Sequence, residues 1–414
     1  MTKTRYLLFI SLMFGILFNL GNPAIPAYIN SLGISGMFVG FYLASGGLGL
    51  MLFATIWGAL GDILDRSKVL AITFIGFALG QTIIGSFTNE YLILLGMFTS
   101  GIFGAGVLVN IYSYINDNFK ETHDRNKVLS YAVSLYMIGG AFAYLLGGTI
   151  TRILNPDFNY VFYIQALLLL AFGIFIFFEK IDLEDTDNHL TRRYFWTNIK
   201  QVVKMPWVPI YTITLTFFIS FSHNNVRRFL DYYVIDSNYS ALDLGLLVFT
   251  VGVVSLVSNL IIAPFFMKRY HNFRFLQIQF LFAPILLYLG FRTENLLIGL
   301  YTYYIGYTIM LAIYEPTAIS FMSSNKAVPQ GILVGVRQSI VGLGMTLGFI
   351  IGGFLYEINE LYVFYLSVIF YIMVFVGFTI LVYIKKTDVI SYRKNYLKEV
   401  KSNDWNRTWK LWNN

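Results

Sequence analysis

The chain has 414 residues, of which 57% are hydrophobic and only 12% are charged, and its net charge is +7. Soluble domains carry about 25% charged residues, so this composition indicates a protein surrounded by lipid. The chain has no cysteine, which excludes disulfides and thiolate metal sites, and its four histidines show no metal-ligand spacing. The composition therefore predicts an all-α integral membrane protein with no metal and no cofactor.

Twelve apolar segments follow one another along the chain. A helix needs roughly 20 apolar residues to cross the bilayer core. The first segment contains too many polar residues and prolines for a cleaved signal peptide. The predicted spans are residues 6–29, 36–60, 69–87, 91–116, 128–150, 160–178, 207–235, 241–267, 274–291, 294–322, 331–357 and 361–384.

The Lys and Arg residues predict which way the spans face. An even number of spans places both termini on one side of the membrane, and 24 of the 29 Lys and Arg residues fall in segments on that side. Cytoplasmic loops collect Lys and Arg, so both termini are predicted to be cytoplasmic. The positive charges are then topology signals in a multi-pass protein of the plasma membrane, and they do not indicate a nucleic-acid partner.

A polar stretch divides the spans into two groups of six. Residues 179–206 form the longest internal polar segment and are predicted to be a cytoplasmic linker. This linker separates an N-terminal six-helix half, 1–178, from a C-terminal six-helix half, 207–384. The basic tail, 385–414, is expected to be cytoplasmic, either as a helix on the inner leaflet or as a disordered segment.

An internal repeat relates the two halves. A constant shift of 205 residues superposes landmarks of the first five spans on their counterparts without gaps. Because each half has six spans, the repeat is parallel, and transporters with such repeats bind substrate between the halves near the bilayer midplane. The repeat therefore predicts two parallel six-helix halves around a central cavity. The matched pairs are Asn19 with Asn224, Gly40 with Gly245, Gly101 with Gly306, Gly139 with Gly344, and Gly147–Gly148 with Gly352–Gly353.

The loop between the second and third spans carries a recognisable pattern. Gly58 and Asp62 precede a basic pair, Arg66 and Lys68, which we expect to hold the loop on the anionic side of the membrane. This stretch resembles the loop signature of the major facilitator superfamily, although two of its positions depart from that pattern. The resemblance implies that Asp62 helps to lock an outward-facing state, and Arg125 in the next cytoplasmic loop is its proposed basic partner.

Glycine-rich elements in the fifth and eleventh spans extend this resemblance to the drug-efflux branch of the superfamily. Small residues at such spacing let helices approach closely enough to slide or rock. Tyr144 and Phe349 stand where the branch usually has proline, and Met97 stands where proton-coupled exporters usually have arginine. These departures leave the direction of transport and the coupling ion open. The glycines are Gly139, Gly147, Gly148, Gly344, Gly348, Gly352 and Gly353.

The resemblance also implies that the first, fourth, seventh and tenth spans line the cavity. The same spans carry polar groups, and an ionisable group inside a span costs roughly 2.5–3.5 kcal/mol on insertion scales, so such groups usually have a role. Asn19 and Asn22 are expected on one face of the first helix. The candidate substrate-binding or coupling residues are Asn19, Asn22, Asn110, Tyr114, Asn224, Arg227, Arg228, Asp231, Tyr314, Glu315, Arg337 and Gln338.

Two charged groups of residues stand out among these candidates. Glu315 and Arg337 lie at similar depths, roughly 12 Å and 10 Å from the cytoplasmic ends of their helices, so they form either a proton-coupled pair or a static ion pair. In the seventh span only one of Arg227 and Arg228 can face the cavity squarely, and Asp231 can pair with either. An arginine left unpaired there would favour an anionic substrate group.

The leading hypothesis is a monomeric secondary active transporter that exports lipophilic or amphiphilic compounds with proton coupling. The sequence has no phosphate-binding Gly-x-x-x-x-Gly-Lys-Ser/Thr loop, which argues against ATP-driven transport, and it has no catalytic constellation typical of an enzyme. The alternative is an importer or exchanger of a small polar or anionic metabolite. A more distant alternative is a non-transporting sensor or lipid-handling protein with the same fold.

Overall fold

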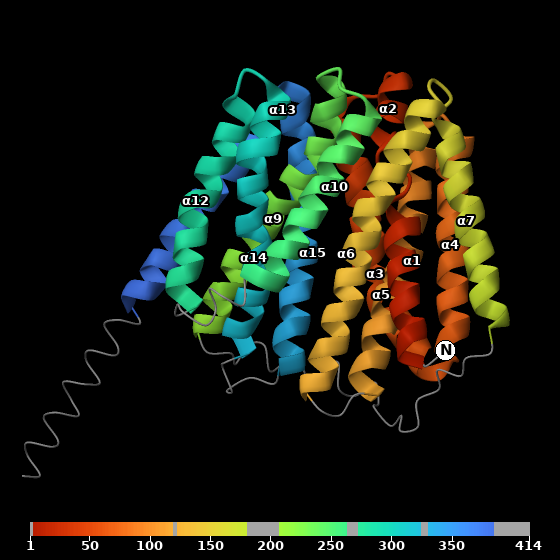
Figure 1. Ribbon diagram of the computed structural model, residues 1–414, viewed down its shortest axis with the longest axis horizontal. Coiled ribbons are helices and arrows are strands. Elements are labelled where there is room, and N and C mark those ends of the chain that lie inside the picture. The colour runs from red at the N-terminus through yellow and green to blue at the C-terminus, as the bar shows by residue number, and fades with distance from the viewer. Residues whose placement is uncertain (1–2, 119–121, 180–206, 263–271, 324–329, 385–414) are drawn as a thin grey trace, which may run out of the picture.

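The computed structural model describes residues 3–118, 122–179, 207–262, 272–323 and 330–384. All regular secondary structure in these ranges is helical, and they contain no strand. The predicted linker, apart from Glu179, and almost all of the predicted tail lie outside the described residues. The described helices form one bundle of two halves, with α1–α7 on one side and α9 to the last helix on the other (Figure 1).

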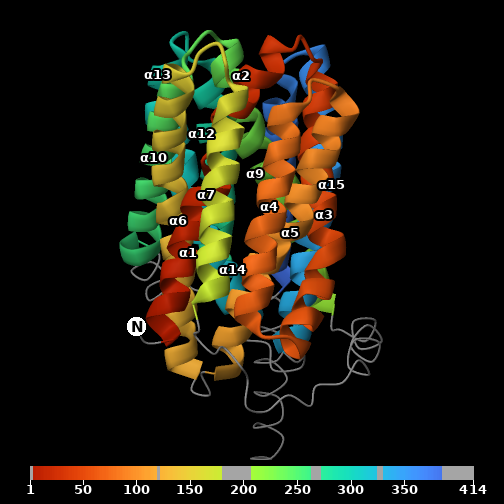
Figure 2. The ribbon, with the colours of Figure 1, turned by 90° about the vertical axis from the view of Figure 1, so that its right-hand side faces the viewer.

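The first half contains six membrane-crossing segments. The first of them is made of two helices, α1 and α2, and the other five are single helices. Figure 2 shows α4 and α7 on the face of this half that is turned away from the second half. The helices are α1 (Lys3–Asn19), α2 (Ala24–Ser31), α3 (Gly36–Ile63), α4 (Arg66–Ser86), α5 (Glu90–Asn118), α6 (Thr122–Ile153) and α7 (Asn159–Phe178).

The second half also crosses six times, and two of its spans contain a π-helical segment. The helices are α9 (Trp207–Asp236), α10 (Ala241–Val257) continued by η1 (Ser258–Ile262), α12 (Asn272–Arg292), α13 (Leu296–Gly299) continued by η2 (Leu300–Tyr304) and α14 (Ile305–Ser323), α15 (Gln330–Ile358), and a last helix, Tyr362–Ile384. Eleven of the twelve segments are long and apolar enough to cross a membrane by length and composition alone. The twelfth, α9, has 30 residues and carries Arg227, Arg228 and Asp231.

The first span departs from its prediction because its helix is broken at residues 20–23. Pro23 has no N–H to donate to the carbonyl of Asn19, and its ring would clash with that carbonyl in a continuous helix. The Asn19 carbonyl instead accepts from the backbone N–H of Asn22, at 3.1 Å. The interruption leaves Asn19 and Asn22 side by side, as the sequence predicts. Their side chains meet through a hydrogen bond of 2.9 Å from Asn22 to Asn19.

Packing within each half follows the internal repeat. In the first half α1 packs against α6, and in the second half α9 packs against α15, which are the equivalent helices at the shift of 205 residues. Gly139 of α6 lies against the backbone of α1, Gly147 lies against the Leu20 backbone just after α1, and Gly344 of α15 lies against the backbone of α9. Gly348 lies against the same stretch of α9, and Gly352 lies against side chains of that helix. The absence of side chains at these glycines permits the close approach of the paired helices.

Packing between the halves follows the same repeat. Helix α6 packs against α10, and α15 packs against α3. Gly148 of α6 lies against the carbonyl of Ala241, while a Cβ added to Gly353 of α15 would lie 2.7 Å from the Cα of Gly40. In α6 and in α15, therefore, the last glycine of the element, Gly148 or Gly353, lies at the seam between the halves, while the glycines before it pack within their own half.

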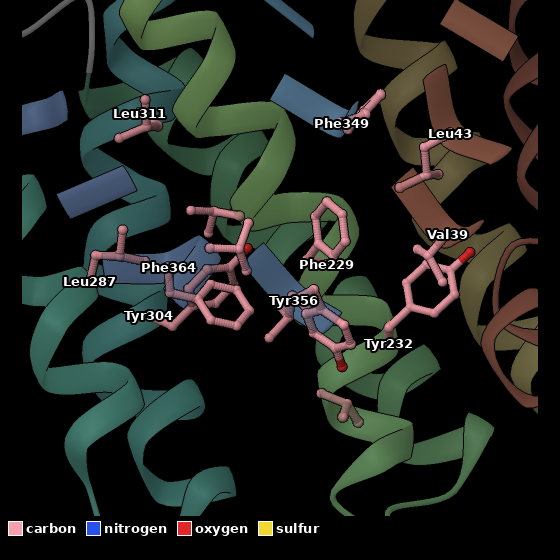
Figure 3. Close-up of a cluster of buried hydrophobic side chains, with 14 of the residues drawn as sticks. Val39, Leu43, Phe229, Tyr232, Leu287, Tyr304, Leu311, Phe349, Tyr356 and Phe364 are labelled. Carbon is pink, nitrogen blue, oxygen red and sulfur yellow. The ribbon is translucent and has the colours of Figure 1, made fainter. Parts of the chain in front are cut away.

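A buried hydrophobic cluster also joins the halves (Figure 3). Val39 and Leu43 of α3 lie beside Phe229 and Tyr232 of α9, and Figure 3 shows Tyr232 reaching from α9 toward Val39. Phe349 of α15 belongs to the same cluster. Lipid removes most of the hydrophobic driving force between helices, so close packing of these side chains supplies the cohesion.

The halves are joined at the end of the bundle that holds α2 and α13, which we call the α2 end (Figure 1). At this end Asp236 accepts a hydrogen bond of 2.6 Å from Asn30 of the first half and another from Tyr356. Glu357 of α15 accepts from the backbone N–H of Met37 at 3.0 Å, in the first turn of α3. That helix has no side-chain cap of its own, so a carboxylate from the other half satisfies one of its free N–H groups.

Candidate functional site

A cluster of three polar side chains links the halves in the part of the bundle nearer the α2 end. The Tyr144 hydroxyl of α6 donates a hydrogen bond of 2.9 Å to the Asp231 carboxylate of α9. Arg228 donates through Nη1 to the Tyr144 hydroxyl at 3.2 Å and lies 3.8 Å from the same carboxylate. The direct ion pair is longer than a hydrogen bond, so the tyrosine bridges the two charges. Any movement that separates α6 from α9 therefore breaks two contacts of this cluster together.

Glycines position this cluster. Gly245 of α10 lies against the backbone of α6, where a Cβ would meet the Tyr144 carbonyl at 2.5 Å, and Gly148 one turn later lies against α10. This close approach holds α6 against the second half and directs Tyr144 toward α9. On α9, Arg228 and Asp231 are three residues apart and hence neighbours on one helical face.

A small cavity adjoins the cluster. Its volume is about 10 Å³, roughly the space that one water molecule needs. Both halves line it: Asn22 follows α1, Tyr42 and Met97 come from α3 and α5, and Arg228, Asp231 and Tyr232 come from α9. Aliphatic side chains of α2 and α3 complete the wall. The space thus combines donor groups with an apolar surround, as binding sites for small molecules commonly do.

Several candidates from the sequence lie in or near this site. Asn22, Arg228 and Asp231 line the cavity, and Asn19 is buried and bonded to Asn22. Arg227 is exposed. The structure thus directs Arg228 into the cavity and leaves Arg227 outside its lining.

Other candidates lie away from the cavity. Asn110 is buried against α3, where its amide donates to the carbonyls of Gly106 at 2.8 Å and Trp57 at 3.4 Å. The Asn224 amide donates to the Ser220 carbonyl of its own helix at 2.8 Å. Tyr314 is buried, with its hydroxyl 3.4 Å from that of Thr216. The amide groups of Asn110 and Asn224 thus donate within or between neighbouring helices, while the buried Asn110 Oδ1 has no hydrogen-bond partner among the described residues. None of the three residues lines the cavity.

Some predicted residues cannot be placed by their side chains. The side chains of Tyr114, Glu315, Gln338, Gly58, Asp62 and Arg125 lie outside the described residues. Arg337 is buried in α15. The suggested pairs Glu315–Arg337 and Asp62–Arg125 therefore stay predictions.

The basic residues of the predicted switch loop behave differently from each other. Lys68 is exposed, as its expected place near lipid headgroups requires. Arg66 is buried, and its Nε donates to the carbonyl of Gly61 at 3.2 Å. Arg66 therefore donates to one of the free backbone carbonyls at the C-terminal end of α3. Its side chain is buried and does not extend toward the membrane surface, where we expected it.

Sequence reasoning did not select three tyrosines of the site. For Tyr144, the sequence offers one sign of a functional role: it stands where the glycine-rich element usually has a proline. Tyr42 and Tyr232 could not be distinguished among the 30 tyrosines of the chain. Among the described residues, no group of three or more His, Asp or Glu side chains is arranged to hold a metal ion.

Comparisons with known proteins agree with this architecture. A sequence model described as "Major Facilitator Superfamily" matches residues 7–332. The quinolone resistance protein NorA of Staphylococcus aureus (strain COL) is 22% identical over 343 residues, which cover 81% of this chain and 85% of NorA. Multidrug resistance protein 2 of Bacillus subtilis (strain 168) is 20% identical over 408 residues, which cover 95% and 96% of the two chains.

A solved structure shows the same fold. A bacterial homologue of the human lysosomal transporter Spinster, in an inward-facing and occupied conformation, superposes with a TM-score of 0.73 at 14% identity. The superposition covers 91% of this chain and 95% of the homologue.

Proposed function

The chain belongs to the major facilitator superfamily and is a multi-pass membrane transporter, and we propose that it exports lipophilic or amphiphilic compounds in exchange for protons. The observation that carries this proposal is the Tyr144–Asp231–Arg228 cluster, which crosses the seam between the halves beside a cavity. The two relatives described above are named for resistance to quinolones and to multiple drugs, which supports export of drug-like compounds.

Alternating access gives this cluster a role in proton coupling. In the present conformation Asp231 is buried and receives a hydrogen bond from Tyr144 of the opposite half. When the halves separate at the α2 end, Tyr144 moves away with the first half. Opening also brings water and protons to the Asp231 carboxylate, which is buried in the present conformation, so we assign Asp231 as the group that exchanges protons in that state.

The proposal includes the sidedness of the membrane. The Lys and Arg distribution supports a plasma-membrane protein with cytoplasmic termini, and the α2 end then faces outward. In that orientation the present conformation is closed to the outside, and protons reach Asp231 after the α2 end opens. We propose that the monomer is the transporting unit.

Transport by purified protein in liposomes tests the coupling role of Asp231. Asp231→Asn keeps the size of the side chain but cannot bind and release a proton. We expect this variant to lose dye accumulation driven by an imposed pH gradient while it still exchanges dye across the membrane at equilibrium. Asp157→Asn, at an exposed carboxylate between α6 and α7, is the matched control and should behave as the wild type. Gradient-driven accumulation by Asp231→Asn at the wild-type rate contradicts the proposal.

One observation favours a second candidate, the uptake or exchange of an anionic metabolite. Arg227 has no acidic partner within ion-pair distance among the described residues, although it lies within a turn of Asp231. The two candidates differ in direction. Expression of an exporter lowers the amount of dye in intact cells, whereas expression of an importer raises uptake of one labelled metabolite and leaves dye unchanged.

A further inference from the structure

Two hydroxyl groups in the wall of the central cavity have no hydrogen-bond partner. Tyr42 of α3 is 1% exposed and Tyr232 of α9 is 3% exposed, and the hydroxyl of each is unsatisfied in the described structure. Leaving a buried polar group without a partner is unfavourable, and most such groups in proteins are bonded. Both side chains line the same cavity, one from each half. The hydroxyls are therefore placed to bond something that enters this space.

Hydrogen-bond donors are in excess around the cavity. The Arg228 guanidinium carries five N–H groups, and among the described residues only its bond to Tyr144 is made. The Asn22 amide uses one of its two hydrogens, on Asn19. The acceptors on this wall are fewer: the Asp231 carboxylate, whose Oδ2 already receives the Tyr144 hydroxyl, and the Asn22 amide oxygen. A group that accepts several hydrogen bonds therefore fits this wall better than a group that donates them.

The charges point in the same direction. In the cavity lining Arg228 and Asp231 balance each other. Arg227, next to Arg228 on α9 but outside the lining, brings the net charge of residues 227–231 to +1. A singly charged anion would bring this stretch to neutrality while Asp231 keeps its contacts with Arg228 and Tyr144. A cationic amphiphile would add to the positive charge.

We propose that this cavity recognises the anionic group of an amphiphilic substrate, with Arg228 as its ion-pair partner and the Tyr42 and Tyr232 hydroxyls as donors from the two halves. The aliphatic wall of α2 and α3 and the Met97 side chain contact the apolar body of the substrate. The cavity now has room for about one water molecule, so a carboxylate enters only when α3 and α9 separate. The inference rests on the proposed transport function, because alternating access supplies that separation.

Binding to the purified full-length protein in lipid nanodiscs tests this assignment. The probe is a fatty acid with a fluorescent dansyl group, 11-(dansylamino)undecanoic acid, and its methyl ester is the uncharged match. Empty nanodiscs correct for partition into lipid. We expect the wild type to bind the acid at least about tenfold more tightly than the ester, and Tyr42→Phe and Tyr232→Phe each to remove most of this preference. Equal binding of acid and ester by the wild type overturns the proposal.

Thermal stability separates a binding role from a structural one. The hydroxyls of Tyr42 and Tyr232 are unsatisfied without ligand, so the Phe variants should be at least as stable as the wild type. Tyr307→Phe is the matched control, since the Tyr307 hydroxyl is buried and bonded to that of Tyr371 at 2.7 Å. This control should lower stability and leave the acid preference intact. If Tyr42→Phe and Tyr232→Phe lower stability as the control does and keep the acid preference, the hydroxyls hold only a structural water and the proposal is wrong.

The anion site and the export function can be tested separately. Gradient-driven export of neutral dyes together with equal acid and ester binding overturns the anion site and leaves the export function standing. Acid-selective binding that depends on Tyr42 and Tyr232, together with no gradient-driven transport of any probe, supports the site and overturns the export function.

Discussion

The seam between α3 and α15 provides a sharp test of the packing between the halves. A Cβ added at Gly353 would lie 2.7 Å from the Cα of Gly40 and 2.9 Å from its backbone nitrogen. Ordinary contact begins at 3.4 Å, so Gly353→Ala requires the two helices to separate by about 0.7 Å. The obstructing atoms belong to the backbone and cannot rotate away. We therefore expect this substitution to strain the seam.

The expected magnitude follows from two opposing effects. Replacing glycine by alanine inside a helix contributes about 0.5–1 kcal/mol of stability through the backbone. Overpacking at a close contact costs about 1–3 kcal/mol. Gly342→Ala on the same helix gains the first effect without the second, because its nearest foreign atom, Cγ of Met51, lies at 3.8 Å. The difference in stability between the two variants is therefore about 1–3 kcal/mol, with Gly353→Ala the less stable.

The midpoint of thermal unfolding in one detergent, measured for both variants and the wild type, gives this comparison. Gly353→Ala should unfold at a lower temperature than Gly342→Ala, which should match or exceed the wild type. A third variant, Gly46→Ala, meets the flexible end of the Met97 side chain at 2.6 Å and should fall between them, because that side chain can move. If Gly353→Ala is as stable as Gly342→Ala, the reasoning about backbone contact at this seam is refuted.

Two further predictions concern the α2 end. Asp236→Ala removes the acceptor for Asn30, whose hydrogen bond joins the two halves, and should favour opening of this end by about 0.5–1.5 kcal/mol; the Tyr356 bond that is also lost lies within the second half. Spin labels on the ends of α2 and α13 should report a larger population of long distances, whereas Asp243→Ala, whose carboxylate bonds only within its own half, should leave the distances unchanged. Burial, and then the Asp236 carboxylate, raise the pKa of Glu360 above its usual 4.5, so the folded protein holds this proton more tightly than the unfolded chain. The unfolding free energy should therefore fall as pH rises through this pKa. Glu360→Gln cannot titrate and should not show this part of the fall. If the difference in melting temperature between Glu360→Gln and the wild type does not change with pH, the assignment is wrong.

Much of the architecture was present in the sequence as pattern. Apolar runs of about 20 residues predict membrane helices because lipid provides no hydrogen bonds for an exposed backbone, and each predicted span corresponds to a helical segment of the structure. The constant shift of 205 residues matched glycines that occupy equivalent seams, such as Gly148 and Gly353. Arg228 and Asp231, the charged residues of the site on α9, are also predicted by the sequence, since charge inside an apolar run is costly and rarely accidental.

The partners of those residues were decided only by the tertiary structure. Sequence spacing allowed Asp231 to pair with either Arg227 or Arg228. In the structure α6 packs against α10 and places the Tyr144 hydroxyl between Arg228 and Asp231, so Arg228 is the partner. Pro23 interrupts the first span because it lacks a backbone N–H, yet the hydrogen bond from Asn22 to Asn19 keeps the two side chains together. Periodicity reports which face of a helix is polar. Which groups meet across that face depends on how closely and in what register the helices pack. Contacts between residues far apart in the chain set that packing.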